Sequence, residues 1–209
     1  WGAGLGLAYA SAHPQRCMGA VIRGVFLSRP ADLQWFFEDA KQCMPDAWAA
    51  FNRHLNTPDA PLSQVLCDGL LHADEGKALS MALAWQAWEI ALTNRHFQDS
   101  PLPKPSAQEA TALLAKYRLQ SHYLQHLCFF PEDGLLSHVS HLCNMPVSLL
   151  HGRLDWICRP EAAWAVHQAI AGSRMHMIDN AGHNLFESPM TATLVREINT
   201  MVDQLRAKG

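Results

Sequence analysis

The sequence has few charged residues, no surplus of basic ones and no paired cysteines. Only 17% of its 209 residues are charged, and 16 Lys and Arg residues stand against 19 Asp and Glu residues, which gives a formal net charge of −3. No basic stripe could neutralise a run of phosphates, so we expect no nucleic-acid partner. With 49% hydrophobic residues, 12 Gly and 12 Pro, the composition also excludes a disordered chain and a collagen.

The six cysteines occur singly, without the C-x-x-C pairs that mark zinc or redox sites. This pattern excludes a small disulfide scaffold and is typical of free thiols in a reducing cytoplasm, where we expect the protein to reside. No apolar run reaches the roughly 20 residues that cross a bilayer, and the first residues lack a signal peptide's basic region, so we expect no membrane anchor. The 12 histidines include pairs at helical spacing without a recognisable third ligand, so we expect no metal.

An α/β pattern at both ends of the chain encloses a helical middle. Residues 1–12 are typical of a helix rich in small residues, and the apolar run at 18–22 is typical of a strand buried in a parallel sheet. Two similar runs near the C-terminus alternate with helical patterns. These later elements are strands at 146–151 and 175–178 and helices at 161–171 and 191–205.

The middle of the chain has the character of Trp-rich helices separated by Pro-rich loops at 56–61 and 99–105. A capping box, Ser106-x-x-Glu109, opens a helix that we expect to end near residue 127. The order α/β, helical, α/β favours one sheet domain, residues 1–27 and 143–209, that carries an inserted helical cap at 28–142. Two helix faces should point inward, one formed by Met81, Trp85, Trp88 and Leu92 and the other by Leu113, Tyr117, Gln120, Leu124 and Leu127.

Two turns that follow predicted strands carry ionisable residues. Asp155 lies in His-Gly-Arg-Leu-Asp after the strand at 146–151, and His183 lies in Asp-Asn-Ala-Gly-His after the strand at 175–178. Ligands of open α/β sheets bind beyond the carboxyl ends of the strands. A carboxylate that orients a histidine general base is the arrangement that a hydrolase uses beside its nucleophile. The alternative is a turn-capping Asp155 and a surface histidine.

Motifs along the whole chain resemble those of the prolyl iminopeptidase family, the proline-releasing serine aminopeptidases of the α/β-hydrolase fold. The Trp-x-x-Trp-Glu helix is the most distinctive of them. The matching segments are Trp1-Gly2, Leu7–Ala10, His13-Pro14, Arg23–Phe26, Leu33–Phe37, Pro45–Trp48, Ala84–Glu89, His122-Tyr123, His151–Asp155, Cys158 and Gly182–Glu187.

The resemblance implies a parallel sheet flanked by helices, with an inserted helical cap and no cofactor. In the family a Gly-Gly-Ser-Trp-Gly segment carries the nucleophilic serine immediately before the tryptophan matched by Trp1, so we expect the nucleophile and the earlier strands to be missing from this chain. The backbone N–H of Trp1 would be one oxyanion donor, Asp155 the orienting acid and His183 the base. An upstream segment of the same protein would then be needed to complete the sheet.

The resemblance also implies residues that bind a small peptide with a free N-terminal proline. Glu89 matches a glutamate that binds the substrate's α-amino group, and Gln120 stands where the family has a second such glutamate, which weakens the expected charge assistance. The family's positions around the proline ring match Arg23, Phe26, Phe36 and Cys158.

Each of these assignments has a plainer alternative. Glu89 could be exposed or paired with Arg95, Gln120 could be a core amide, Phe36 could be core, and Cys158 could be a structural thiol. The expected function is hydrolysis of an N-terminal proline bond through an acyl-serine intermediate. There are two alternatives: a related esterase or amidase, and a noncatalytic protein that binds peptide amines.

Overall fold

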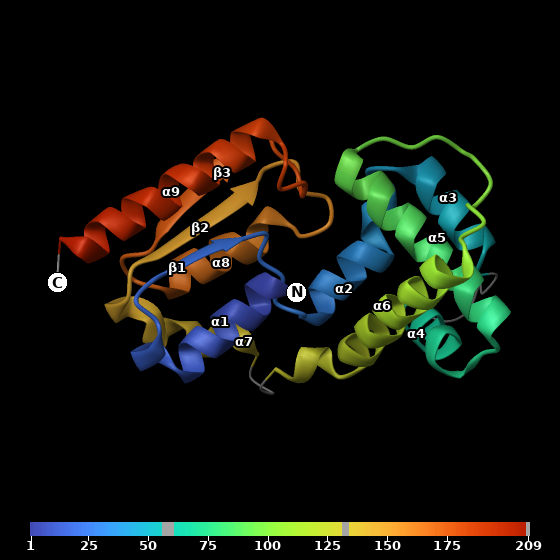
Figure 1. Cartoon of the computed structure of the whole chain (residues 1–209), viewed down its shortest axis with the longest axis horizontal. Helices are drawn as coiled ribbons and strands as arrows, with labels where there is room; N and C mark the ends of the chain where they lie inside the picture. The colour runs from blue at the N-terminus through green and yellow to red at the C-terminus, as the bar shows by residue number, and fades with distance from the viewer. Residues whose placement is uncertain (56–60, 131–133, 208–209) are drawn as a thin grey trace. The chain divides into compact units, whose positions relative to one another are not determined.

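The computed structural model describes residues 1–55, 61–130 and 134–207 and is drawn in Figure 1. The chain divides into two compact units. The sheet unit comprises residues 1–27 and 130–209, and the helical unit comprises residues 28–129. The first division agrees with the expected one after residue 27, whereas the second falls after residue 129 rather than after residue 142.

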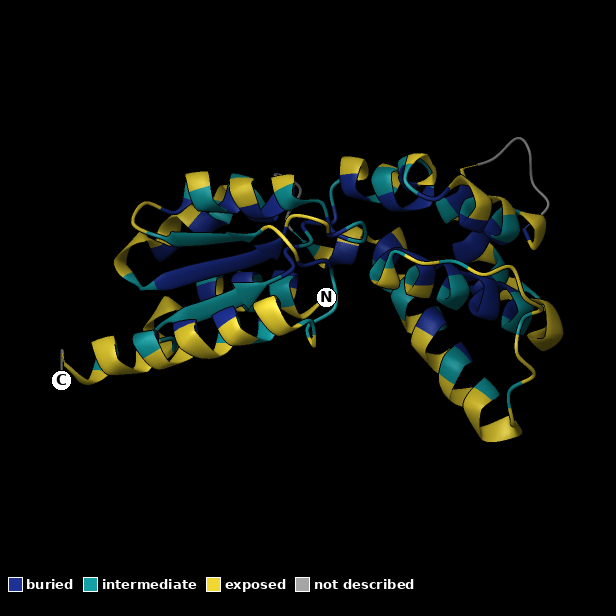
Figure 2. Ribbon diagram, turned by 90° about the horizontal axis from the view of Figure 1, so that it is seen from above, coloured by how far each residue is buried: buried dark blue, intermediate teal, exposed yellow. Residues whose placement is uncertain are grey.

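In the described part of the chain, three short strands form the sheet, in the order β1 (Ala20–Arg23), β2 (Val147–Gly152) and β3 (Arg174–Ile178). All neighbours are parallel, and Ala20 is in register with Val147. Every residue of β2 is buried, as the dark central strand in Figure 2 shows. A strand covered on both faces is expected to be largely apolar, and the two polar side chains of β2, Ser148 and His151, are both hydrogen-bonded.

Helices pack on both faces of this sheet. Leu149 of β2 belongs to a buried cluster with Leu7 and Val166, whereas the next residue, Leu150, belongs to a second cluster with Met190. Successive strand residues point to opposite faces, so the two clusters lie on opposite sides of β2. The elements of the sheet unit besides the strands are α1 (Gly2–Ala12), η1 (Pro14–Arg16), α7 (Leu135–His138), η4 (Val139–Asn144), α8 (Pro160–Ala169) and α9 (Ser188–Arg206).

The segment before β2 explains why the second boundary between the units lies after residue 129, earlier than expected. Leu135, Val139 and Leu142 are almost completely buried and belong to the same cluster as Leu149. These three side chains lie on the short α7 and η4, whose packing attaches them to the sheet rather than to the helical unit. The expected boundary at 142/143 placed them with the helices, because a short apolar helix has no sequence mark of the core that it joins.

The helical unit is built around two tryptophans of α5. Trp85 and Trp88 are buried, and Nε1 of Trp88 donates a hydrogen bond to the carbonyl of Phe36 at 3.0 Å. The expected face of α5 is confirmed, since Met81 and Leu92 are buried as well. The elements of this unit are α2 (Pro30–Phe37), η2 (Asp39–Gln42), α3 (Pro45–Arg53), α4 (Leu62–His72), α5 (Glu75–Asn94), α6 (Ala107–Gln125) and η3 (Leu127–Phe129).

The start of α6 agrees with its capping box, but its inward face differs in part from the expected one. Ser106 donates its backbone N–H to Glu109 Oε2 at 2.8 Å, as the motif requires. Tyr117 and Leu124 are buried, whereas Leu114 rather than Leu113 completes the buried face. Leu127 is 47% exposed, because α6 ends at residue 125 and the backbone of residue 127 is left-handed.

The remaining predictions concern loops, thiols and membrane spans. Residues 99–105 form a loop as expected, and most of the expected loop at 56–61 lies outside the described residues. All six cysteines are free, and burial raises the pKa of the Cys67 thiol to about 11, which keeps it protonated at neutral pH. Within the described ranges, no helix is long and apolar enough to cross a membrane.

Candidate active site

The turns that follow β2 and β3 are in direct contact at the carboxyl edge of the sheet. A Cβ atom at Gly152, the last residue of β2, would overlap the carbonyls of Ala181 and Gly182. Backbone N–H of Leu154 also donates to the carbonyl of Ala181 at 3.0 Å. Only glycine permits this close approach, and the approach brings the Asp155 turn against the His183 turn.

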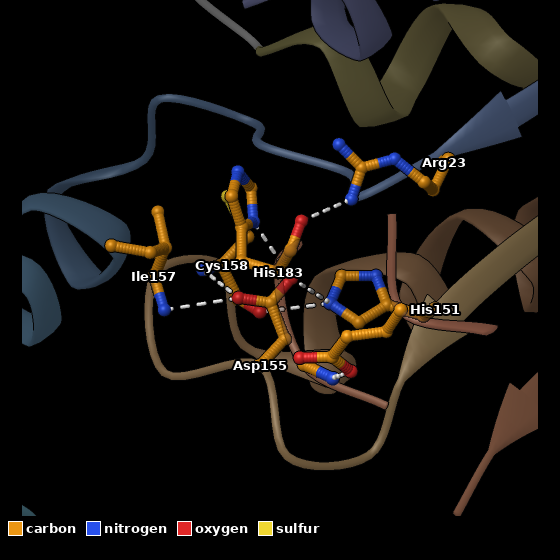
Figure 3. Close-up of polar contacts among 8 residues, drawn as sticks. Arg23, His151, Asp155, Ile157, Cys158 and His183 are labelled. Carbon is orange, nitrogen blue, oxygen red and sulfur yellow. Dashed lines mark hydrogen bonds and ion pairs between the residues drawn. The ribbon is translucent and has the colours of Figure 1, made fainter. Parts of the chain in front are cut away.

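Asp155 is buried and its carboxylate is surrounded by donors. The side chain is 1% exposed. Oδ1 accepts hydrogen bonds from the backbone N–H groups of Ile157 at 3.0 Å and Cys158 at 2.8 Å (Figure 3). These bonds close a tight turn after β2 and fix the direction in which the other oxygen points.

His183 meets the second oxygen of this carboxylate. Its Nδ1 lies 2.9 Å from Asp155 Oδ2, although the two residues are 28 positions apart in the chain (Figure 3). The His183 side chain is 28% exposed, so the imidazole joins a buried carboxylate to the surface. The expected hydrogen bond between these two side chains is therefore present.

Neighbouring groups hold the backbone around His183. Glu187 Oε2 accepts the backbone N–H of Gly182 at 2.7 Å, and the Arg23 guanidinium donates to the carbonyl of His183 (Figure 3). Gly24 has a φ of +62°, and a Cβ there would lie 3.5 Å from the imidazole Cε1. Arg23 was expected beside the proline ring of a substrate. In the structure it is hydrogen-bonded to the loop that carries His183.

A second histidine approaches Asp155 from the end of β2. His151 is fully buried, and its Nε2 lies 2.8 Å from the carbonyl of Cys158 and 3.4 Å from Asp155 Oδ2. Because a carbonyl can only accept, Nε2 must carry the proton. Burial is the main effect on the pKa of His151 and lowers it, against the raising effect of Asp155, so this imidazole is neutral at pH 7.

The sequence identifies His151 only as part of a motif. Two sequence features could have marked His151 as a candidate site residue. It ends a strand-like segment, and it lies four residues before Asp155. A polar side chain in an otherwise apolar strand needs a hydrogen-bond partner, and the turn that follows the strand supplies it.

Three further sequence-selected residues lie in the sheet unit. Trp1 precedes α1, whose N-terminus lies at the edge of the sheet where the strands end (Figure 1). A Cβ at Gly4 would lie 2.8 Å from the carbonyl oxygen of Phe26, so the segment after β1 runs along the start of α1. Cys158 is buried and its backbone N–H binds Asp155. Trp1, Phe26 and Cys158 thus belong to the segments around the same strand ends.

The other three selected residues lie in the helical unit. Phe36 is 8% exposed and packs against Phe37 and Trp85, which is a core environment. Glu89 and Gln120 are in contact, with Gln120 Nε2 donating to Glu89 Oε1 at 3.2 Å. Glu89 forms an ion pair with Lys116, a partner that the sequence did not suggest.

Histidines are grouped at two places outside this site. The rings of His122 and His126 are 4.7 Å apart, and those of His138 and His141 are 6.5 Å apart. In the part of the chain that the structure describes, no three His, Cys, Asp or Glu side chains are arranged to hold a metal ion.

A family model described as alpha/beta hydrolase fold matches residues 1–189 of the chain. The match covers both strand-end turns. The chain belongs to the α/β-hydrolase fold family. In α/β-hydrolases the acid and then the histidine follow the nucleophile along the chain. The positions of Asp155 and His183 after consecutive strands of the parallel sheet agree with this order.

This α/β-hydrolase is similar to several proline iminopeptidases. It is 32% identical over 211 residues to a probable proline iminopeptidase of Leptolyngbya boryana, with 98% of this chain and 64% of the relative covered. It is 31% identical over 205 residues to the proline iminopeptidase of Xylella fastidiosa (strain Temecula1 / ATCC 700964), covering 97% and 65%. The corresponding Arabidopsis thaliana enzyme is 31% identical over 201 residues, covering 93% and 52%. The chain therefore spans about two thirds or less of the length of these relatives.

Proposed function

We propose that this chain is part of a serine-type aminopeptidase that releases N-terminal proline from peptides. The observation that carries the proposal is the 2.9 Å contact between His183 Nδ1 and Asp155 Oδ2 at the carboxyl edge of a parallel sheet. Similarity to proteins named proline iminopeptidase supports the choice of substrate. No cofactor enters the proposal.

In this mechanism His183 is the general base and then the general acid. Its Nδ1–H donates to Asp155, which leaves Nε2 to take the proton of a serine hydroxyl as that oxygen attacks the carbonyl carbon of the proline residue. The imidazolium that forms is stabilised by the buried carboxylate. His183 next gives the proton to the leaving amine, and water then releases proline from the acyl-serine by the same proton transfers.

We further propose that the serine precedes Trp1 in the complete protein. α1 begins at the sheet edge where the strands end, which is where a strand-to-helix turn would place a nucleophile (Figure 1). A strand that enters α1 in a parallel unit would lie beside β1, which pairs with β2 alone among the described strands. The backbone N–H of Trp1 would then be an oxyanion donor.

The helical unit would supply substrate recognition. We propose that Glu89 binds the ammonium of the substrate with help from Gln120, because an aminopeptidase has to distinguish a free amine from a blocked one. Phe26, Phe36 and Cys158 remain proposed contacts of the proline ring, and the helical unit remains a proposed cap. Six free cysteines support a cytoplasmic location.

The contacts of Glu89 favour a second candidate function. Its carboxylate is already paired with Lys116, and its neighbour Gln120 carries no charge. A site with a neutralised carboxylate would suit an esterase or amidase that accepts uncharged acyl groups. A noncatalytic protein that binds peptide amines is the alternative from another class.

A substrate panel tests these functions. The protein, including the residues that precede Trp1, is assayed with proline 4-nitroanilide, N-acetylproline 4-nitroanilide and 4-nitrophenyl acetate. We expect rapid hydrolysis of the first and slow hydrolysis of the second. Equal rates on both anilides would indicate an amidase, turnover of the acetate alone an esterase, and binding of prolinamide without turnover a noncatalytic protein.

A further inference from the structure

Among the described residues, three side chains donate to the carboxylate of Glu89, and all three belong to α6. Lys116 Nζ lies 3.1 Å from Oε2, the Tyr117 hydroxyl donates to the same oxygen at 2.8 Å, and Gln120 Nε2 donates to Oε1 at 3.2 Å. Three residues within one turn of α6 therefore converge on a single side chain of α5. Of the three, only Lys116 brings a positive charge.

The surroundings of this carboxylate are suited to an ammonium ion. The Lys116 ammonium also lies 4.4 Å from the centre of the Tyr117 ring, so it contacts both an anion and an aromatic face. A carboxylate beside an aromatic ring is the combination that binds amines in proteins. Burial, followed by the charge of Glu89, raises the pKa of Tyr117, so its hydroxyl remains a donor to the carboxylate.

The two partners of the ion pair differ in exposure. The Glu89 side chain is 22% exposed, whereas the Lys116 side chain is 52% exposed. Glu89 is held by Tyr117 and Gln120 in addition to Lys116, whereas the lysine is on a flexible stem at the surface. Lys116 Nζ also donates to the Tyr117 hydroxyl at 3.1 Å, so an external ammonium that replaced it would meet the same two oxygens, one of Glu89 and one of Tyr117.

We propose that Lys116 is the resident cation of an ammonium site at Glu89 and a specificity-determining residue that competes with the amine of the substrate. This inference rests on the proposed function in so far as Glu89 is the amine anchor there. The local charge supports it. Glu89 and Lys116 cancel each other's charge, and Gln120 is neutral, so the site has no net charge. A substrate ammonium therefore gains little electrostatic binding energy unless the Lys116 side chain moves away from Glu89.

Removing the competing charge tests the inference. Binding of L-prolinamide to the complete protein is measured by titration calorimetry for wild type and for Lys116→Met, which keeps the length of the stem. We expect Lys116→Met to bind about threefold to fivefold more tightly, the range that a part-exposed ion pair supports. The gain should shrink at high salt, because added ions screen exposed charges.

Matched variants and ligands separate competition from other effects of the substitution. Lys116→Arg keeps the charge and should bind as wild type does. Lys104→Met removes an equal charge from an exposed position in the loop before α6 and should change nothing. N-acetylprolinamide, which has no ammonium, should not distinguish wild type from Lys116→Met.

Equal prolinamide affinities of wild type and Lys116→Met would overturn the inference, as would an equal gain in Lys104→Met. Absence of binding to both proteins would overturn it together with the anchoring role of Glu89. The assay with proline 4-nitroanilide separates the two levels. If the complete protein hydrolyses proline 4-nitroanilide but Lys116→Met does not change prolinamide affinity, only the competition by Lys116 is refuted. If Lys116→Met binds prolinamide more tightly but the protein does not hydrolyse the anilide, only the proposed reaction is refuted.

Discussion

At the scale of single residues, Asp155 is held by backbone N–H groups and imidazoles. Two backbone N–H groups bind Oδ1, and two imidazoles approach Oδ2. His151 is the inner of these imidazoles and is fully buried, so its neutral form donates without adding a charge. The Asp155 carboxylate would stabilise the imidazolium of His183 during proton transfer.

Removing the inner imidazole should weaken both the turn and the catalytic pair. His151→Leu leaves the Cys158 carbonyl without its donor, and we expect a loss of about 1–3 kcal/mol in the free energy of unfolding. His151→Gln can place an amide N–H near the former Nε2 and should recover most of the loss. Urea unfolding of the three proteins at pH 8 measures the free energy of unfolding. Equal losses in both variants would show that the Nε2–H hydrogen bond does not contribute to stability.

The lowered pKa of His151 also predicts a pH dependence of stability. In the unfolded chain this imidazole titrates near 6.5, whereas burial lowers its pKa in the folded protein. The unfolded state therefore binds the proton first, and the stability present above pH 6.5 is lost as the pH falls towards the folded value. Comparing urea midpoints between pH 8 and 5 should show a smaller decline in His151→Gln than in wild type.

Asp155 and His183 could be predicted from the sequence because each follows an apolar run of strand length. The contacts of Arg23 and Lys116 could not, since each depends on a residue that the fold brings near from another part of the chain. Hydrophobic periodicity identifies elements, but it does not specify which polar atoms meet across them.

At the scale of elements, α9 is attached to the sheet by a buried acid. Glu197 is 5% exposed and its Oε2 lies 3.1 Å from the Ser148 hydroxyl, 3.3 Å from Arg174 Nε and 3.1 Å from His176 Nε2. Burial acts to raise the pKa of Glu197, but these three partners outweigh it and the pKa is lowered. One side chain of α9 thus binds residues of both β2 and β3.

Neutralising this acid should loosen α9. Glu197→Gln keeps the shape but removes the charge that Arg174 faces, and we expect a cost of about 1–3 kcal/mol at pH 7. The contribution of the charge is complete above the usual pKa of 4.5 and is lost as the pH falls through the lowered folded value. Urea unfolding should therefore show a smaller difference between wild type and variant at pH 3.5 than at pH 7; a difference independent of pH would contradict an ionic role.

Most elements were predictable because each has a strong local signal. Each strand contains a short, mainly apolar segment, α6 begins with a capping box, and α5 has a regular buried face. The second boundary of the helical unit was not predictable in the same way. Leu135, Val139 and Leu142 are apolar in either unit, and only their packing assigns them to the sheet.

At the scale of the whole molecule, large apolar side chains are exposed on α1 and on the segment before β1. Leu5 and Tyr9 of α1 and Met18 before β1 are exposed, and β1 pairs with β2 alone among the described strands. Unpaired edge strands bind other strands readily. This surface is consistent with the proposal that an upstream segment of the complete protein lies there.

A comparison of two proteins tests that proposal. Residues 1–209 alone and the complete protein with its upstream residues are heated and followed by circular dichroism and light scattering. We expect the complete protein to melt cooperatively and residues 1–209 to aggregate, with proline 4-nitroanilide hydrolysed by the complete protein only. A soluble fragment that melts cooperatively and hydrolyses the substrate would refute both the missing strands and the missing nucleophile.

The most direct test of the account is the effect of Asp155→Asn on kcat/KM for proline 4-nitroanilide in the complete protein. The amide would leave the imidazole in the wrong tautomer, so we expect kcat/KM to fall about 10³-fold to 10⁴-fold with an unchanged circular dichroism spectrum. Asp179→Asn, at an exposed aspartate after β3, is the matched control and should retain activity. A value for Asp155→Asn within about tenfold of wild type would contradict the assignment of Asp155 and His183 as the catalytic pair.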